Sequence, residues 1–156
     1  MDKERIIQIT INGIRKQGAS FSIDRLSLEA KMSKKTIYGI FSSKTELGKG
    51  IFEYLLVSFP SSCGVSLHES LKAYSTFLGI AQNGILDRLG FSNEERDYLL
   101  SQKDKMFDLF YSFFGKRADG PKESLRFVLE SSLPRVFTMD SSDETLFGIQ
   151  KVIFHE

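Results

Sequence analysis

Hydrogen-bond donors gather within a short stretch of this sequence: Lys34, Lys35, Thr36 and, two positions on, Tyr38. Lysine donates to O6 and N7 of guanine, while threonine donates, accepts or touches the methyl group of thymine. Ser33 precedes this group, and serine is a favoured N-cap that would start a helix here. The pattern therefore indicates a helix whose first turn presents base-reading side chains to DNA.

Two short helices and a tight turn must position these side chains. Ser22 is a good N-cap for the first helix, and its apolar residues recur at helical spacing: Ile23, Leu26 and Ala30. The second helix has its own apolar positions at Ile37, Ile40 and Phe41. Ser43 and Glu46 have capping-box spacing and open a third helix. Two short helices joined by about three residues form a helix-turn-helix, whose second helix enters the major groove.

The segment from Ile23 to Leu47 resembles the N-terminal domain of TetR/AcrR-type transcriptional regulators. Its most specific part is Thr36-Ile37-Tyr38-x-x-Phe41-x-x-Lys44, and the resemblance covers about the first 55 residues. It implies an all-helical homodimer that binds a palindromic operator, with a C-terminal domain that often binds a small effector. Two positions depart from the family pattern: Lys31 stands at a turn where glycine is usual, and Ile40 where many members carry histidine.

The resemblance also extends the set of predicted DNA contacts. Tyr38 is similar to the family tyrosine that bonds a backbone phosphate. Lys44 and Ser22 each lie at a helix N-terminus, where free N–H groups favour phosphate. The predicted DNA-binding residues are Ser22, Lys34, Lys35, Thr36, Tyr38 and Lys44. The structural alternative is a solvated lysine face with Tyr38 packed half-buried.

Charge is distributed unevenly along the 156 residues. Residues 1–50 contain ten basic and five acidic residues, and the remainder contains eleven basic and fifteen acidic residues. A basic end that meets phosphates and an acidic remainder suit a one-ended DNA binder. The single Cys63 excludes an intrachain disulfide, and no apolar run approaches the length of a membrane span. We expect a soluble, cytoplasmic protein with no membrane partner.

Helical segments are expected along the whole chain, which predicts an all-α protein. They cover residues 2–17, 44 to about 58, 66 to about 83, 92–115, 121 to about 132 or slightly beyond Pro134, and 141 onward. Pro60 to Gly64 is a predicted helix breaker. The predicted domains are a helix-turn-helix domain, 1–50, and a helical regulatory and dimerisation domain, 51–156. This second domain is short for the family, so either the protein is a compact member or the sequence omits part of its C-terminal end.

Two glycines bear on the connection between these domains. Gly48 and Gly50 lie in the first turns of the helix that joins them, where glycine lowers helix propensity. We therefore expect a soft connection.

Residues with catalytic potential are scattered. His68 and His155 are far apart without a metal-ligand pattern, and Cys63 has no nearby histidine. Neither common form of Gly-rich phosphate loop occurs. The sequence predicts no enzyme activity, no metal site and no cofactor.

Aromatic residues in the second domain have two interpretations. They are Tyr74, Phe77, Phe107, Phe110, Tyr111 and Phe114. They form either a hydrophobic core or dimer seam, or the wall of a pocket for a small hydrophobic effector, and helical spacing fits both. A second dimer seam is predicted along the last helix, at Leu146, Ile149, Val152, Ile153 and Phe154.

The function that fits these features is a TetR-like transcriptional regulator, a repressor, acting as a homodimer on double-stranded DNA. One alternative is a DNA-binding protein of the same fold that lacks small-molecule sensing and responds to a protein partner. Another is a small helical enzyme or ligand carrier with an incidental helix-turn-helix.

Overall fold

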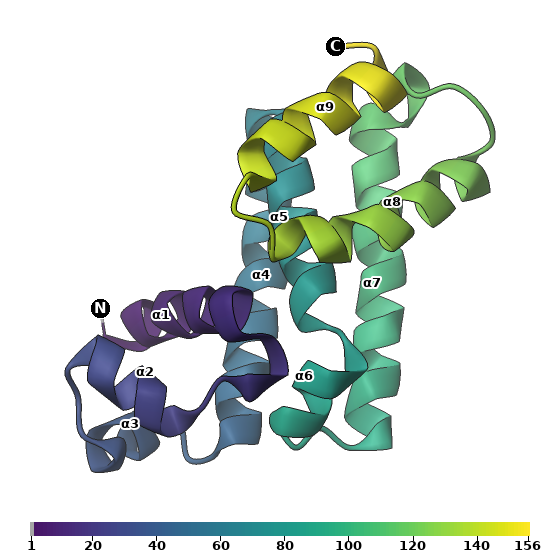
Figure 1. Ribbon diagram of the computed structural model, residues 1–156. Coiled ribbons are helices and arrows are strands. Elements are labelled where there is room, and N and C mark those ends of the chain that lie inside the picture. Colours follow the sequence, from purple (N-terminus) through teal and green to yellow (C-terminus); the bar gives the residue numbers. More distant parts are fainter. Residues whose placement is uncertain (1) are drawn as a thin grey trace.

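The computed structural model describes residues 2–156, and in these residues it contains nine α-helices and no strand (Figure 1). The helices are α1 (Asp2–Gln17), α2 (Ile23–Ala30), α3 (Lys34–Ile40), α4 (Lys44–Val65), α5 (Leu67–Ile80), α6 (Asn83–Arg88), α7 (Asn93–Phe114), α8 (Lys122–Phe137) and α9 (Ser142–Phe154). Short 3₁₀ turns follow α1 and α7. The predicted all-α class is confirmed. Within residues 2–156 no helix combines the length and apolarity that crossing a membrane needs.

Serine side chains start five of these helices. The capping residues are Ser22, Ser33, Ser43, Ser66 and Ser92, and each serine Oγ accepts a hydrogen bond from the backbone N–H three residues on, at 3.0–3.2 Å. The caps at Ser22, Ser33 and Ser43 were predicted from the sequence. At α7 the cap is reciprocal, because Glu95 Oε1 also accepts from Ser92 N at 2.9 Å. At α4 only the Ser43 half of the predicted capping box forms, and Glu46 contacts Lys49 instead.

Helix α4 continues through the segment that was predicted to break it. Pro60 lies inside α4 on its exposed side, whereas Leu55, Phe59 and Cys63 continue the buried stripe. A proline inside a helix costs roughly 3 kcal/mol, but burying Phe59 alone contributes about 1.5–3 kcal/mol and its neighbours add more. The predicted end near Ser58 was therefore wrong, and the expected domain limit at residues 50 and 51 falls inside a continuous helix.

Helix α5 forms the centre of the structure, between α4 and α8 (Figure 1). Every residue from Tyr74 to Ile80 is buried. The chain approaches α8 most closely at Gly79, where an added Cβ would lie 2.2 Å from Cδ2 of Phe137. Only glycine permits this separation of the two helices.

Helix α6 was not predicted, because the sequence suggested one helix continuing to Asn83. Its six residues are too few for a periodic pattern, and its N-cap, Gln82, forms no side-chain capping bond. Burial of Ile85 and Leu86 holds it in place. Arg88 then donates from Nε to the carbonyl oxygen of Phe21 at 3.1 Å, which ties α6 to the residues before α2.

The N-terminal head, residues 2–41, packs directly on the remaining helices (Figure 1). At the start of α4, an added Cβ on Gly48 would lie 2.7 Å from Cε1 of Phe91, and one on Gly50 would lie 2.8 Å from Cε1 of Phe41. Thr45 Oγ1 donates to the carbonyl oxygen of Leu89 at 2.7 Å. Both glycines therefore allow close packing at the start of α4, with Phe91 on one side and Phe41 on the other. The soft connection stays a prediction.

Replacement of Gly79 by alanine tests the α5–α8 contact. The added methyl group has no room beside Phe137, so Gly79→Ala should lower the free energy of unfolding by about 1–3 kcal/mol. Gly148→Ala is the matched control, because nothing lies within 4 Å of the added Cβ and the site is inside a helix. It should raise stability by up to roughly 1 kcal/mol. Urea unfolding followed by circular dichroism measures both, and equal effects would contradict the close contact.

The reciprocal cap at α7 predicts a pH dependence of stability. The Ser92 backbone N–H and Lys49 lower the pKa of Glu95 from 4.5 to about 2. The folded state favours the ionised form of Glu95. The resulting contribution of Glu95 to the free energy of unfolding is therefore complete above pH 4.5 and is lost as the pH falls toward 2. Glu95→Gln should therefore cost about 0.5–1 kcal/mol near pH 7 and progressively less in acid. Urea midpoints across this range measure the difference, and Asp97→Asn on the same helix should show no such trend.

Candidate nucleic-acid interface

Helix α3 has one buried face and one exposed face. Ile37 is buried in the hydrophobic core, as is Phe41 directly after the helix. Lys34, Lys35, Thr36 and Tyr38 are all exposed. The helix thus presents the four predicted DNA-contacting residues to solvent on its outer side.

The turn between α2 and α3 is held by hydrogen bonds at the end of α2. Lys31 adopts the left-handed conformation, with φ 55°, and its N–H donates to Leu28 O. The N–H of Met32 donates to Ser27 O at 3.2 Å, and the Ser27 hydroxyl donates back to Met32 O. Ser27 is a structural residue that the sequence analysis missed. The resemblance placed Lys31 at a turn where glycine is usual, and the left-handed conformation found there is one that glycine favours.

Helix α1 stabilises this turn through a hydrogen bond from Arg5. Arg5 Nη2 donates to the carbonyl oxygen of Ala30 at 2.9 Å, which satisfies an acceptor at the end of α2. Arg5 is therefore a structural cation rather than one available to DNA.

Lys34 brings the starts of α2 and α3 together. Its ammonium forms an ion pair with Asp24 in the first turn of α2, and this hydrogen bond raises the pKa of Lys34. Both side chains are more than half exposed, so the pair contributes little to stability and can open at little cost. Lys34 is thus held close to the position from which it would reach DNA.

The remaining residues of the first turn differ in their local contacts. Thr36 Oγ1 lies 2.9 Å from Ser33 Oγ, beside the N-cap of α3. Tyr38 is 40% exposed, so it fits both the predicted phosphate contact and the half-buried packing of the structural alternative. Lys35 forms no ion pair within residues 2–156.

Ser22 and Lys44 lie at the starts of α2 and α4. Ser22 Oγ accepts from Arg25 N, so its hydroxyl hydrogen remains available to a phosphate oxygen. Lys44 is the first residue of α4, is exposed, and also has no ion-pair partner among the described residues. Capped helix starts with unpaired N–H groups and a nearby cation provide a suitable environment for phosphate.

The six predicted effector-pocket residues lie in or against the hydrophobic core. Tyr74, Phe77, Phe107 and Phe110 are fully buried, Phe114 is nearly so, and Tyr111 packs against them. The ring of Tyr74 lies edge-to-face with Phe59 and tilted against Phe110, with ring centroids 6.1 and 5.8 Å away. Its hydroxyl is buried without a hydrogen-bond partner in the described structure, and this desolvation raises the pKa of Tyr74.

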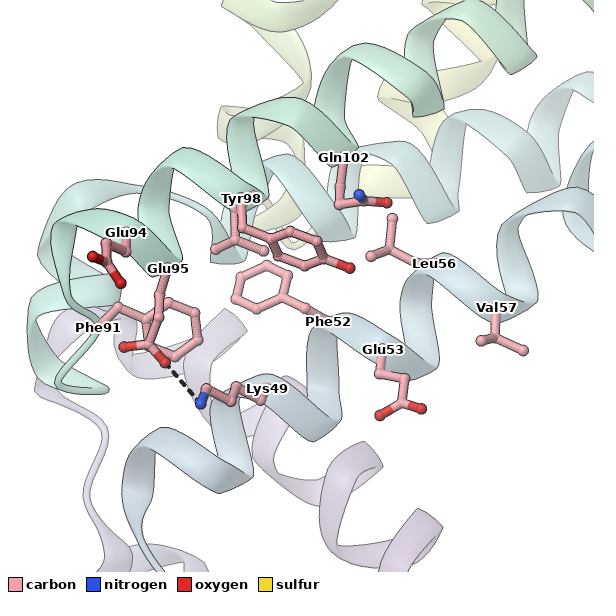
Figure 2. A pocket seen from close by; sticks show the side chains of 11 residues that line it. Lys49, Phe52, Glu53, Leu56, Val57, Phe91, Glu94, Glu95, Tyr98 and Gln102 are labelled. Carbon is pink, nitrogen blue, oxygen red and sulfur yellow. Dashed lines mark ion pairs between the residues drawn. The ribbon is translucent and has the colours of Figure 1, made fainter.

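A groove lies elsewhere, between α4 and α7, and the sequence analysis missed it. Its volume is about 530 Å³, and it is lined by Lys49, Phe52, Glu53, Leu56, Val57, Phe91, Glu94, Glu95, Tyr98, Leu99 and Gln102 (Figure 2). Its residues come from two helices and the segment before α7, which share no sequence motif. The one feature of the sequence that could have indicated this groove was Tyr98, an aromatic residue next to Leu99 on the predicted apolar stripe.

The two histidines form polar contacts in separate places. His68 Nε2 lies 3.2 Å from Asp143 and its Nδ1 lies 2.8 Å from Gln150, which links α5 to α9. His155 contacts Asp119 at 2.8 Å. In the part of the chain that the structure describes, no three His, Cys, Asp or Glu side chains lie close enough to hold a metal ion together.

Comparison with known proteins found no matching family model, no similar curated protein and no similar solved structure.

The left-handed Lys31 predicts that a glycine at this position would stabilise the protein. An L-residue in this conformation costs about 1 kcal/mol relative to glycine, so Lys31→Gly should raise the free energy of unfolding by about 0.5–1 kcal/mol. Lys35→Gly is the matched control inside α3 and should lower it by about 1 kcal/mol. Thermal and urea unfolding measure both. A destabilised Lys31→Gly variant would show that the lysine side chain contributes more than its backbone strain costs.

Proposed function

We propose that this protein is a TetR-like transcriptional regulator that binds a palindromic operator as a homodimer through α3. Two things support the proposal: the resemblance of residues 23–47 to the family, and the way the same residues are arranged in the structure. A repressor role follows from the family resemblance alone.

The observation that carries the proposal is the exposed first turn of α3 beside the capped start of α2. Lys35 and Tyr38 face solvent there, and an exposed ion pair joins Lys34 at the start of α3 to Asp24 in the first turn of α2. A helix that enters the major groove needs an unobstructed N-terminal turn with donors directed outward. Lys44 supports the same interface, because its charge has no partner within residues 2–156 and lies at the start of α4.

Helices α8 and α9 are the proposed dimer surface. Phe127 is 72% exposed and Val152 is 78% exposed, although both are large apolar residues. Val128, which is 43% exposed, and Val152 line one hollow between these helices, so these two residues lie on a shared face. Of the predicted seam, Leu146 and Phe154 are already buried within the protomer, which leaves Val152 as its exposed member. Burial of such a face in a second copy is favourable at about 25 cal/mol per Å².

The test of DNA binding begins with selection of sites from a random double-stranded library, followed by fluorescence anisotropy on the selected site. Lys44→Ala should weaken binding to all sequences and reduce the slope of log affinity against log salt by about one unit per protomer. Thr36→Val should instead change the base preference at one position of each half-site.

Lys105→Ala is the matched control, because Lys105 is an exposed lysine on α7, outside the head. It should leave affinity and salt slope unchanged. Recovery of no enriched site, or equal binding by the Lys44, Thr36 and Lys105 variants, would contradict the proposed interface. Light scattering on the same samples should give a dimer, and Phe127→Ser with Val152→Ser should give a monomer.

A further inference from the structure

We propose that Asp24 makes DNA binding more selective, because it holds Lys34 in an ion pair that opens for a matching base but not for phosphate alone. The inference rests on the proposed function and deepens it, since it concerns how the same surface distinguishes its operator from other DNA. Asp24 acts through Lys34 and is therefore a positioning residue.

Asp24 lies in the first turn of α2, close to the first residue of α3. The two helices are neighbours in the head (Figure 1), and the Asp24 carboxylate forms an ion pair with the ammonium group of Lys34. The side chain of Asp24 is 71% exposed and that of Lys34 is 55% exposed. The pair thus lies on the solvent-facing surface of the head, among the residues proposed to contact DNA.

A carboxylate at this place opposes DNA binding. Asp24 comes two residues after Ser22, whose hydroxyl group and helix start are proposed to meet phosphate. Like charges repel, so Asp24 lowers the affinity for a duplex of any sequence. An acidic residue in the first turn also complements the dipole of α2, but that effect needs no contact with Lys34. A purely local role therefore leaves the pair with α3 unexplained.

The pair neutralises one of the two lysines that begin α3. Within residues 2–156 Asp24 and Lys34 pair only with each other, while the nearby Arg25 and Glu29 form a separate pair at 3.7 Å. Lys35, the next residue of α3, has no ion-pair partner in the same part of the chain. The first turn of α3 therefore presents one free cation and one cation that already has a counter-charge.

DNA of the wrong sequence offers Lys34 only phosphate oxygens. A free lysine that meets phosphate releases a condensed counterion and gains affinity. Lys34 would instead exchange the Asp24 carboxylate for another anion, so its net gain is small.

An operator with guanine in reach offers Lys34 the base acceptors O6 and N7. Opening an exposed ion pair costs less than about fivefold in affinity, whereas a good base contact provides about 5- to 150-fold discrimination. The base contact therefore outweighs the pair. It follows that the pair weakens binding to other DNA more than binding to operator, which is selectivity by lowered affinity for the wrong partner.

The experiment measures anisotropy on the selected operator and on a scrambled duplex of the same length and composition, across about 50–200 mM salt. Asp24→Asn frees Lys34 for phosphate. The variant should bind the scrambled duplex about threefold more tightly per protomer at the lowest salt, with a salt slope steeper by about one unit per protomer. Its affinity for operator should change less, so the ratio of the two affinities should fall.

Two comparisons isolate the ion pair. Glu29→Gln is the matched control, because it removes one carboxylate from the same helix that pairs with Arg25 and not with Lys34. It should leave the salt slope and the affinity ratio unchanged. In a Lys34→Ala background, Asp24→Asn should no longer steepen the slope. Thermal unfolding of each variant without DNA checks that the head remains folded.

Three results would overturn the inference and leave the proposed function standing. Equal strengthening on both duplexes would make Asp24 a simple repulsive charge. A steeper slope that persists without Lys34 would exclude action through the pair. Weaker operator binding with lost preference at one position would make Asp24 a base contact itself. If the parent protein binds neither duplex, or selection enriches no site, the proposed function fails and this inference fails with it.

Discussion

The structure depends on covering helix α5 from every side. Its residues from Tyr74 to Ile80 are all buried, so α4, α7, α8, α9 and α1 must each supply a packing face. Its polar side chains are compatible with this burial because they bond within the helix: Ser75 and Thr76 both donate to Lys72 O. The close approach at Gly79 then determines how near α8 can lie. Since all the other long helices are arranged around one helix, movement of any of them disturbs a shared core.

The same core includes the N-terminal head, and this limits how the head can move. Gly48 packs against Phe91, and Thr45 bonds to Leu89, so the start of α4 is attached to the segment before α7. Arg15 donates to Phe137 O at 3.2 Å and attaches α1 to the end of α8. Any change of head position must therefore involve α7 or α8 as well. The groove between α4 and α7 lies beside the first of these attachments, because Phe91 lines it.

The basic residues of the head divide into two groups once their partners are known. Arg5 bonds a helix end, and Lys49 bonds carboxylates of α4 and α7, so these cations stabilise the protomer. Lys35 and Lys44 have no such partner within the described residues, and Lys34 has only an exposed one. The positive charge counted over residues 1–50 therefore overstates what is free to meet phosphate. Among the described residues, the cations without an ion-pair partner include Lys35 and Lys44, but also Lys3 and Lys16 of α1 and Lys31 of the turn.

The sequence by itself determined the local features, because they depend on residues a few positions apart. The five serine caps, the left-handed Lys31 and the exposed first turn of α3 were all predictable from short patterns. Tertiary structure decided what depends on distant residues. Because of packing between helices, α4 continues through Pro60 and α6 is stable without a side-chain cap. The same packing brings Gly79 against Phe137 and buries Tyr74 in the core. Helical spacing shows that a side chain has an apolar face, but only packing between helices decides whether that face meets core, groove or solvent.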